Sequence, residues 1–113
     1  MKRVYEQPSR TDGIRILVDR LWPRGLTKEK AAVKLWLKDV APSSELRKWF
    51  GHEPAKWSQF QARYRKELRR KKDAINLLRQ KSNDRTVTLL YGARDDEHNE
   101  AVVLKKVLEG RKR

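Results

Sequence analysis

Short runs of β-branched and aromatic residues predict the strands of this chain. Three such runs lie at residues 3–6, 14–18 and 86–91. In the second run Ile16 and Leu17, which point to opposite faces of a strand, are both apolar. A strand that is apolar on both faces is typical of a sheet that is covered on both sides.

A fourth strand is predicted over residues 33–40, where apolar and polar positions alternate. The pattern places one set of residues on one face and a second set on the other: Val33, Leu35 and Leu37, against Lys34, Trp36 and Lys38. The period of two favours a half-buried strand near a sheet edge over the alternative, which is a helix.

Apolar positions three and four residues apart predict helices between these strands. Thr27 is expected to cap a short helix over residues 28–32, and Ser43 or Ser44 a second helix that ends at Gly51. Further helices are expected from Pro54, from Asp73, and through residues 102–108 with Gly110 at the end.

Strands that alternate with helices predict one small three-layer α/β domain over residues 1–113, with a mainly parallel sheet of about four strands. Residues 110–113 form a short basic tail. In such sheets ligand sites lie outside the carboxyl ends of the strands. Two loops meet this condition, "DRLWPRG" after the second strand and "GARDDEHN" after the last.

The first of these loops carries the residues of an anion site. Arg20 and Arg24 offer planar donors that match phosphate or carboxylate, Trp22 would form an apolar wall, and Asp19 would orient an arginine or act as a general base. The alternative is a structural corner fixed by an ion pair, with Trp22 in the core. We favour the ligand site, because two arginines and a tryptophan on one short loop exceed what a corner requires.

The second loop offers the other half of such a pocket. Gly92 lets backbone approach a ligand closely, Arg94 adds a further planar donor, and the following helix start carries partial positive charge. Acidic residues crowd the same helix start and argue against an anion there: Asp95, Asp96, Glu97 and Glu100. We also expect Tyr91 to form a wall of the pocket. The candidates for proton transfer or orientation are Asp19, His98 and Asn99.

The composition of the chain excludes several kinds of active site. No residue is a cysteine, which excludes disulfides, thiolate metal sites and a cysteine nucleophile. Asp95 and His98 supply too few ligands for a metal, so neither a metal nor another cofactor is expected. The chain shows no signal peptide and no segment of transmembrane length, so we expect a cytoplasmic protein without a membrane partner. The oligomeric state does not follow from the sequence.

The net charge of +14 supports a second hypothesis. Residues 63–72 hold seven basic residues and one glutamate, and a continuous helix there would present a basic face that binds nucleic acid non-specifically together with the tail. Its members would be Arg63, Lys66, Arg69 and Arg70. The plainer alternative is a solvated helix face, and no sequence-reading motif accompanies it. A third hypothesis is a partner-binding module anchored by Trp36 or Trp57.

Four motifs together resemble the family of domain of unknown function 488, in its YeaO-like branch. They are "VDRLWPRG", "KWFGH", "KWSQFQARYRKEL" and "TLLYGARDDEHNEAVVL", and the resemblance runs from about Arg3 to Leu108. It implies an α/β fold and no particular activity. The wider family is similar to rhodanese-type domains, with Asp19 and Arg20 in the place of a strand-end motif. Because the chain has no cysteine, sulfur transfer through a cysteine persulfide is excluded. The only feature that this likeness would still imply is an anion-binding loop.

The sequence therefore predicts a protein that binds a small, phosphate-like anion between the two loops. It does not decide whether the protein is an enzyme. Transfer or hydrolysis at a phosphate-like group would be the first reaction to test.

Overall fold

A computed structural model describes residues 1–110, so most of the predicted basic tail, residues 111–113, lies outside the described residues. The predicted α/β architecture is present, with four parallel strands in the order β1-β4-β2-β3. The strands are β1 (Lys2–Arg3), β2 (Ile14–Leu17), β3 (Leu35–Trp36) and β4 (Val87–Tyr91).

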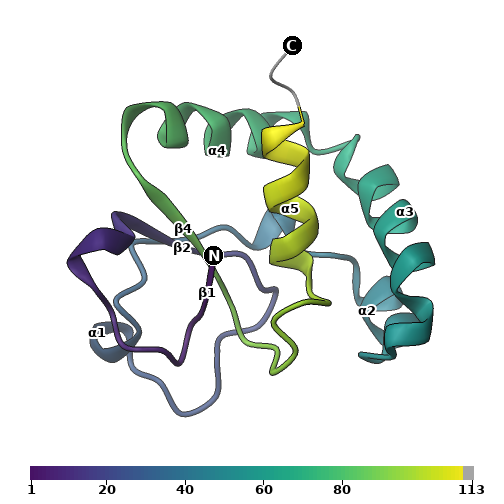
Figure 1. Ribbon diagram of the computed structural model, residues 1–113, viewed down its shortest axis with the longest axis horizontal. Coiled ribbons are helices and arrows are strands. Elements are labelled where there is room, and N and C mark those ends of the chain that lie inside the picture. The colour runs from purple at the N-terminus through teal and green to yellow at the C-terminus, as the bar shows by residue number, and fades with distance from the viewer. Residues whose placement is uncertain (111–113) are drawn as a thin grey trace.

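Five α-helices connect and cover these strands (Figure 1). They are α1 (Lys28–Ala31), α2 (Ser44–Phe50), α3 (Trp57–Leu68), α4 (Lys72–Asp84) and α5 (Glu100–Glu109). Short 3-10 turns occupy Arg10–Asp12, Lys38–Val40 and Pro54–Lys56. The predicted caps are confirmed: Thr27 and Ser43 each accept a hydrogen bond from a helix amide, and Gly51 ends α2 in the left-handed conformation. No helix within residues 1–110 is long and apolar enough to cross a membrane.

Apolar residues on both faces of the sheet make two cores. On one face Ile16 and Leu89 pack with side chains from α2 to α5, and on the other Leu17 and Leu90 pack with Ala31 of α1. Figure 1 shows α1 set apart from the other four helices. The sheet is therefore the middle layer of three, as the two apolar faces of β2 predict.

The strand predicted over residues 33–40 is shorter than expected, because β3 covers Leu35–Trp36 and a 3-10 turn follows. The alternation is confirmed for Leu35 and Trp36, which pack against opposite cores. It is wrong for Val33, which lies on the side of Trp36. Ala32 ends α1 with a φ of 52°, and this left-handed residue turns the chain just before the strand.

Residues 63–72 do not form one helix. Helix α3 ends at Leu68 and α4 begins at Lys72, and the two run in different directions (Figure 1). Leu68 at the end of α3 and Ile75 in α4 both enter the main core. Basic residues four apart at this point, such as Lys66 and Arg70, also repel one another along a helix. The continuous basic face required by the nucleic-acid hypothesis is therefore absent from the described residues.

The register of β2 against β4 places the two predicted loops side by side. Ile14 pairs with Val87 and Leu17 with Leu90. Gly13 makes this start possible, because its φ is 65° and a Cβ there would lie 2.2 Å from the carbonyl oxygen of Thr86. Each partner is 73 positions further along the chain, so the residues just past the strands, Asp19 and Gly92, also meet.

Candidate functional site

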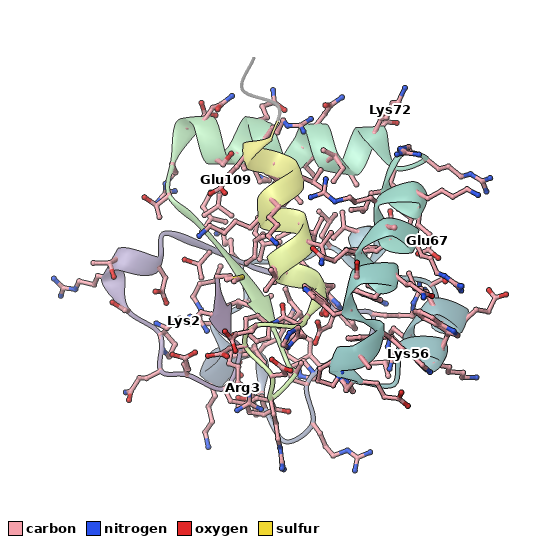
Figure 2. All side chains as sticks on the ribbon, turned by 45° about the vertical axis from the view of Figure 1, so that its right-hand side comes forward. Lys2, Arg3, Lys56, Glu67, Lys72 and Glu109 are labelled. Carbon is pink, nitrogen blue, oxygen red and sulfur yellow. The ribbon has the colours of Figure 1, made fainter. Side chains whose placement is uncertain are left out.

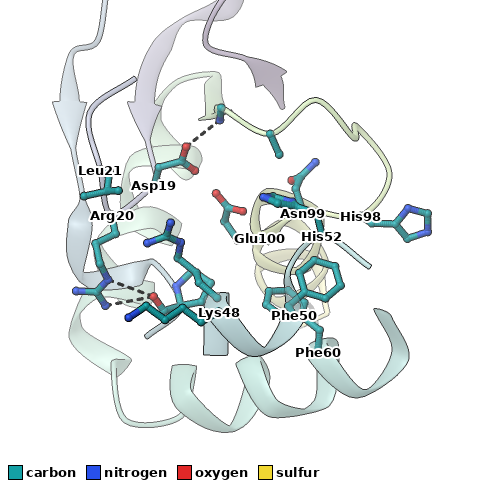
Figure 3. Close-up of a pocket in the computed structure, with 14 residues that line it drawn as sticks. Asp19, Arg20, Leu21, Lys48, Phe50, His52, Phe60, His98, Asn99 and Glu100 are labelled. Carbon is teal, nitrogen blue, oxygen red and sulfur yellow. Dashed lines mark hydrogen bonds between the residues drawn. The ribbon is translucent and has the colours of Figure 1, made fainter. Parts of the chain in front are cut away.

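A pocket of about 360 Å³ lies at the carboxyl ends of β2 and β4 (Figure 3). Both predicted loops line it, and α2, α3 and the start of α5 contribute its other walls. Five of the predicted site residues line the pocket: Asp19, Arg20, Gly92, His98 and Asn99. The position agrees with the general location of sites in open parallel sheets.

Asp19 joins the two loops. Its Oδ2 accepts a hydrogen bond of 2.8 Å from the Gly92 amide. Gly92 eases this approach, since a Cβ there would lie 3.0 Å from the same oxygen, closer than ordinary van der Waals contact. The other oxygen, Oδ1, is buried and has no hydrogen-bond partner among the described residues. Buried polar atoms are normally paired, and the neighbouring Glu100 carboxyl is a group that can donate to Asp19 when it is protonated.

Glu100, which sequence reasoning left among the helix-start acids, faces Asp19 across the pocket (Figure 3). Burial of its carboxyl and the adjacent carboxyl of Asp19 raise the pKa of Glu100 well above its usual value. The nearby guanidinium of Arg47 acts in the opposite direction on this pKa. The neutral acid is favoured, and a neutral carboxyl can donate a hydrogen bond.

Cationic side chains form another part of the wall. Arg20 donates to the Pro42 carbonyl oxygen from Nε at 3.3 Å and from Nη2 at 3.2 Å. Arg47 and Lys48 come from the last turn of α2, where cations also favour the helix dipole. None of these three makes an ion pair with a carboxylate of residues 1–110. Phe50 and Phe60 stack beneath them with ring centroids 4.4 Å apart.

His98 and Asn99 line the pocket but are engaged elsewhere. His98 Nδ1 lies 2.8 Å from Asp95 Oδ2, its ring meets the Trp57 ring edge-on, and Figure 3 shows it directed away from Glu100. Asn99 is the N-cap of α5, with Oδ1 accepting from two helix amides and Nδ2 donating to a backbone oxygen.

The expectation that the acidic residues crowd the start of the last helix is wrong for three of them. Asp95, Asp96 and Glu97 precede Asn99, so they belong to the loop rather than to α5. Hydrogen bonds from the amides of Glu97 and His98 fold this loop around Asp95 and lower the pKa of its carboxyl. Within residues 1–110 no three His, Asp or Glu side chains gather as metal ligands would.

Four other predicted site residues do not line the pocket. Trp22 donates to the Leu26 carbonyl oxygen and packs in the second core, the position that the structural-corner interpretation assigns to it. Tyr91 is buried in the main core, and its burial raises the pKa of the phenol. Arg24 and Arg94 are exposed on their loops.

Sequence reasoning missed several pocket residues, because they come from elements outside the two loops. These are Arg47, Lys48, Phe50, His52, Phe60 and Glu100. The motif "RKWFGH" holds four of them, and its placement after a Ser-capped helix start was visible in the sequence. What the sequence lacks is any signal that α2 ends at the same sheet edge as the loops.

Comparison with known proteins agrees with this fold and adds a family. The family described as "Inactive DUF488-N3 subclade" matches residues 1–113. The chain belongs to this family. It is 42% identical over 109 residues to an uncharacterized protein of Mycobacterium tuberculosis, covering 96% of this chain and 92% of that protein. It is also 42% identical over 103 residues to the uncharacterized protein YeaO of Escherichia coli, covering 91% of this chain and 90% of that one.

The DUF488 resemblance predicted from four motifs is therefore confirmed, including its YeaO-like character. The likeness to rhodanese-type domains stays an expectation. No solved structure matches the chain.

Proposed function

We propose that this DUF488 protein binds a small anionic molecule in the pocket at the carboxyl ends of β2 and β4. The observation that carries the proposal is the set of three cations, Arg20, Arg47 and Lys48, that border one cavity without an ion pair to any carboxylate of residues 1–110. Arginine and lysine at the rim of a concave site are the groups that recognise phosphate and carboxylate in proteins.

The acidic wall limits what else the ligand carries. The raised pKa of Glu100 favours a neutral acid beside the Asp19 carboxylate, so this wall carries one negative charge and several acceptor oxygens. A fully anionic ligand would meet repulsion on that side. A ligand with its anionic group toward α2 and a hydrogen-bond donor toward Asp19 fits both walls. The pocket volume of about 360 Å³ is at the small end of ligand pockets, which suits a molecule of metabolite size.

Binding is the function we propose, and not catalysis. The matching family is described as inactive, and the chain has no cysteine nucleophile. His98 and Asn99, two of the three residues predicted for proton transfer, are held by Asp95 and by the helix cap. Asp19 then serves as a ligand acceptor.

The test is calorimetric titration, with thermal unfolding alongside, using inorganic phosphate and a nucleoside monophosphate as probes. A probe at about ten times its Kd should stabilise the fold by about 1.4 kcal/mol and raise the melting temperature by several degrees. The double variant Arg47→Gln/Lys48→Gln should weaken binding at least about tenfold, because each charge-assisted hydrogen bond contributes about 1.5–3 kcal/mol.

A matched control removes the same charge outside the pocket. Arg24→Gln/Arg94→Gln replaces two exposed residues of the predicted loops that do not line it. This variant should bind as the wild-type protein does. If the control lost binding while the α2 variant kept it, the anion would bind at the loop tips and the proposal would be wrong. The proposal would also be wrong if neither probe bound at millimolar concentration.

A further inference from the structure

A second cavity, of about 490 Å³, lies where the end of α3, the start of α4 and the end of α5 meet. We call it the junction groove. Its cationic residues are Arg65 and Arg69 at the end of α3, Lys72 and Arg79 of α4, and Lys106 of α5. It is separate from the pocket described above, with which it shares no residue.

The cationic residues of this groove lie on both sides of the break between α3 and α4. Arg65 and Arg69 are four residues apart and share a side of the helix end. Lys72, the first residue of α4, lines the same groove. Figure 2 shows Lys72 extending outward from the start of α4.

The positive charge of the junction groove is not neutralised by acidic side chains of the described residues. No aspartate or glutamate of residues 1–110 lines it. Arg65, Arg69 and Lys72 are exposed, and none of them forms an ion pair with a carboxylate of the described chain. Arg79, by contrast, donates to the Val107 carbonyl oxygen and forms part of the groove wall. Three side chains are thus left to meet an anion from outside.

The neighbouring surface between α2 and α3 differs. It holds Arg63, Lys66 and Arg70, but also Glu45 and Glu67. The guanidinium of Arg63 lies over the Trp49 ring at 4.1 Å, which occupies its planar face. Of the residues in the nucleic-acid hypothesis, Arg69 alone borders the junction groove.

We propose that the junction groove binds the phosphate backbone of a nucleic acid, without reading its sequence. Two guanidinium groups offer fork-shaped donors for successive phosphates, and the apolar floor of Leu68, Ile75 and Val107 can pack against sugars. No base-reading motif is present, so the affinity is electrostatic and falls steeply with salt. Gly110 lines the groove, and the sequence continues from it with Arg111, Lys112 and Arg113.

The test is fluorescence anisotropy of a labelled 20-base-pair DNA duplex, titrated with the full chain between about 50 and 200 mM NaCl. The variant Arg65→Gln/Arg69→Gln/Lys72→Gln should lower the slope of log K against log salt by about 2–3, since each lost phosphate contact contributes about 0.9. At about 100 mM salt it should bind at least about tenfold more weakly than the wild-type chain.

Lys28→Gln/Lys30→Gln/Lys34→Gln is the matched control. It removes the same charge from exposed residues in and beside α1, none of which borders the groove, and it should keep the wild-type slope. Equal losses in the two variants would reduce the binding to net charge and overturn the proposal. Displacement of the duplex by polyglutamate at equal charge concentration would also overturn it, in favour of an acidic protein partner. Should the groove variant melt early, Lys72→Gln/Lys106→Gln provides the same comparison against Lys28→Gln/Lys30→Gln.

Discussion

At the scale of single residues, the pocket is marked by one pair of partly buried carboxyl groups. Asp19 and Glu100 face each other in the pocket (Figure 3), and burial together with Asp19 raises the pKa of Glu100 well above its usual value. A group whose pKa is higher in the folded chain favours folding at low pH. That contribution is fully present below the unfolded pKa of about 4.3 and is lost as the pH rises through the folded value.

We therefore expect Glu100→Gln to be more stable than the wild-type chain at high pH. The amide keeps the shape and stays neutral, so the variant should lose less stability between about pH 5 and about pH 9 in urea unfolding. Glu97→Gln, in the loop and exposed, should follow the wild-type curve. Parallel curves for wild type and Glu100→Gln across this range would show that Glu100 titrates normally in the folded chain.

At the scale of elements, α2 is held in place by α3. The Ser43 amide donates to Glu67 Oε1 at 2.9 Å and the Ser43 hydroxyl to Oε2 at 2.6 Å, while the hydroxyl accepts from the Leu46 amide. One carboxylate therefore fixes the start of the helix whose last turn brings Arg47 and Lys48 to the pocket.

Glu67→Ala should cost about 1.5–3 kcal/mol of unfolding free energy, because it removes two hydrogen bonds to a charged acceptor. It should also weaken anion binding several-fold, since α2 loses its anchor. Urea unfolding and calorimetric titration measure the two effects. Glu67→Gln keeps one acceptor and should recover most of both, and Glu45→Ala, on an exposed site of α2, should change neither. If Glu67→Ala lost stability but kept its full anion affinity, anion binding would not depend on the contact between α2 and α3, and this prediction would be wrong.

The sequence predicts these elements well where one chemical signal decides them. The apolar faces of β2 and β4 and the caps at Thr27 and Ser43 all lie where expected. The separate helix expected from Asp73 is also present, as α4 from Lys72, although neither glycine nor proline marks the break after Leu68. What the sequence does not give is the direction in which α4 leaves α3. That information is tertiary and is not present in local periodicity.

At the scale of the whole molecule, the same distinction explains the pocket. Asp19 and Gly92 were predictable together, because parallel strands end at one edge of a sheet and the register brings them into contact. Arg47 and Glu100 were not, since their places depend on how α2 and α5 pack across the sheet. Trp22 was wrongly expected to line the pocket and packs in the second core instead. A large aromatic ring on a short loop gives the same sequence pattern in both cases.

Net charge is the remaining property of the whole molecule, and it makes salt a test of the fold itself. The chain carries +14, and within residues 1–110 only Asp12, Glu53 and Asp95 form ion pairs. Most cations therefore repel one another without local compensation, and shortening the Debye length from about 10 Å at 0.1 M to about 4–5 Å at 0.5 M should relieve this repulsion.

We expect the melting temperature to rise by a few degrees over this range of NaCl, on the order of 1 kcal/mol. The measurement is thermal unfolding in a phosphate-free buffer, which keeps the proposed anion out of the pocket. Both triple variants designed for the junction groove carry +11, since 14 − 3 = 11, and should respond less to salt than the wild-type chain. A melting temperature that falls with NaCl would mean that attraction within the ion pairs outweighs the repulsion. The loss of duplex binding at high salt would then have to be separated from a loss of folded protein.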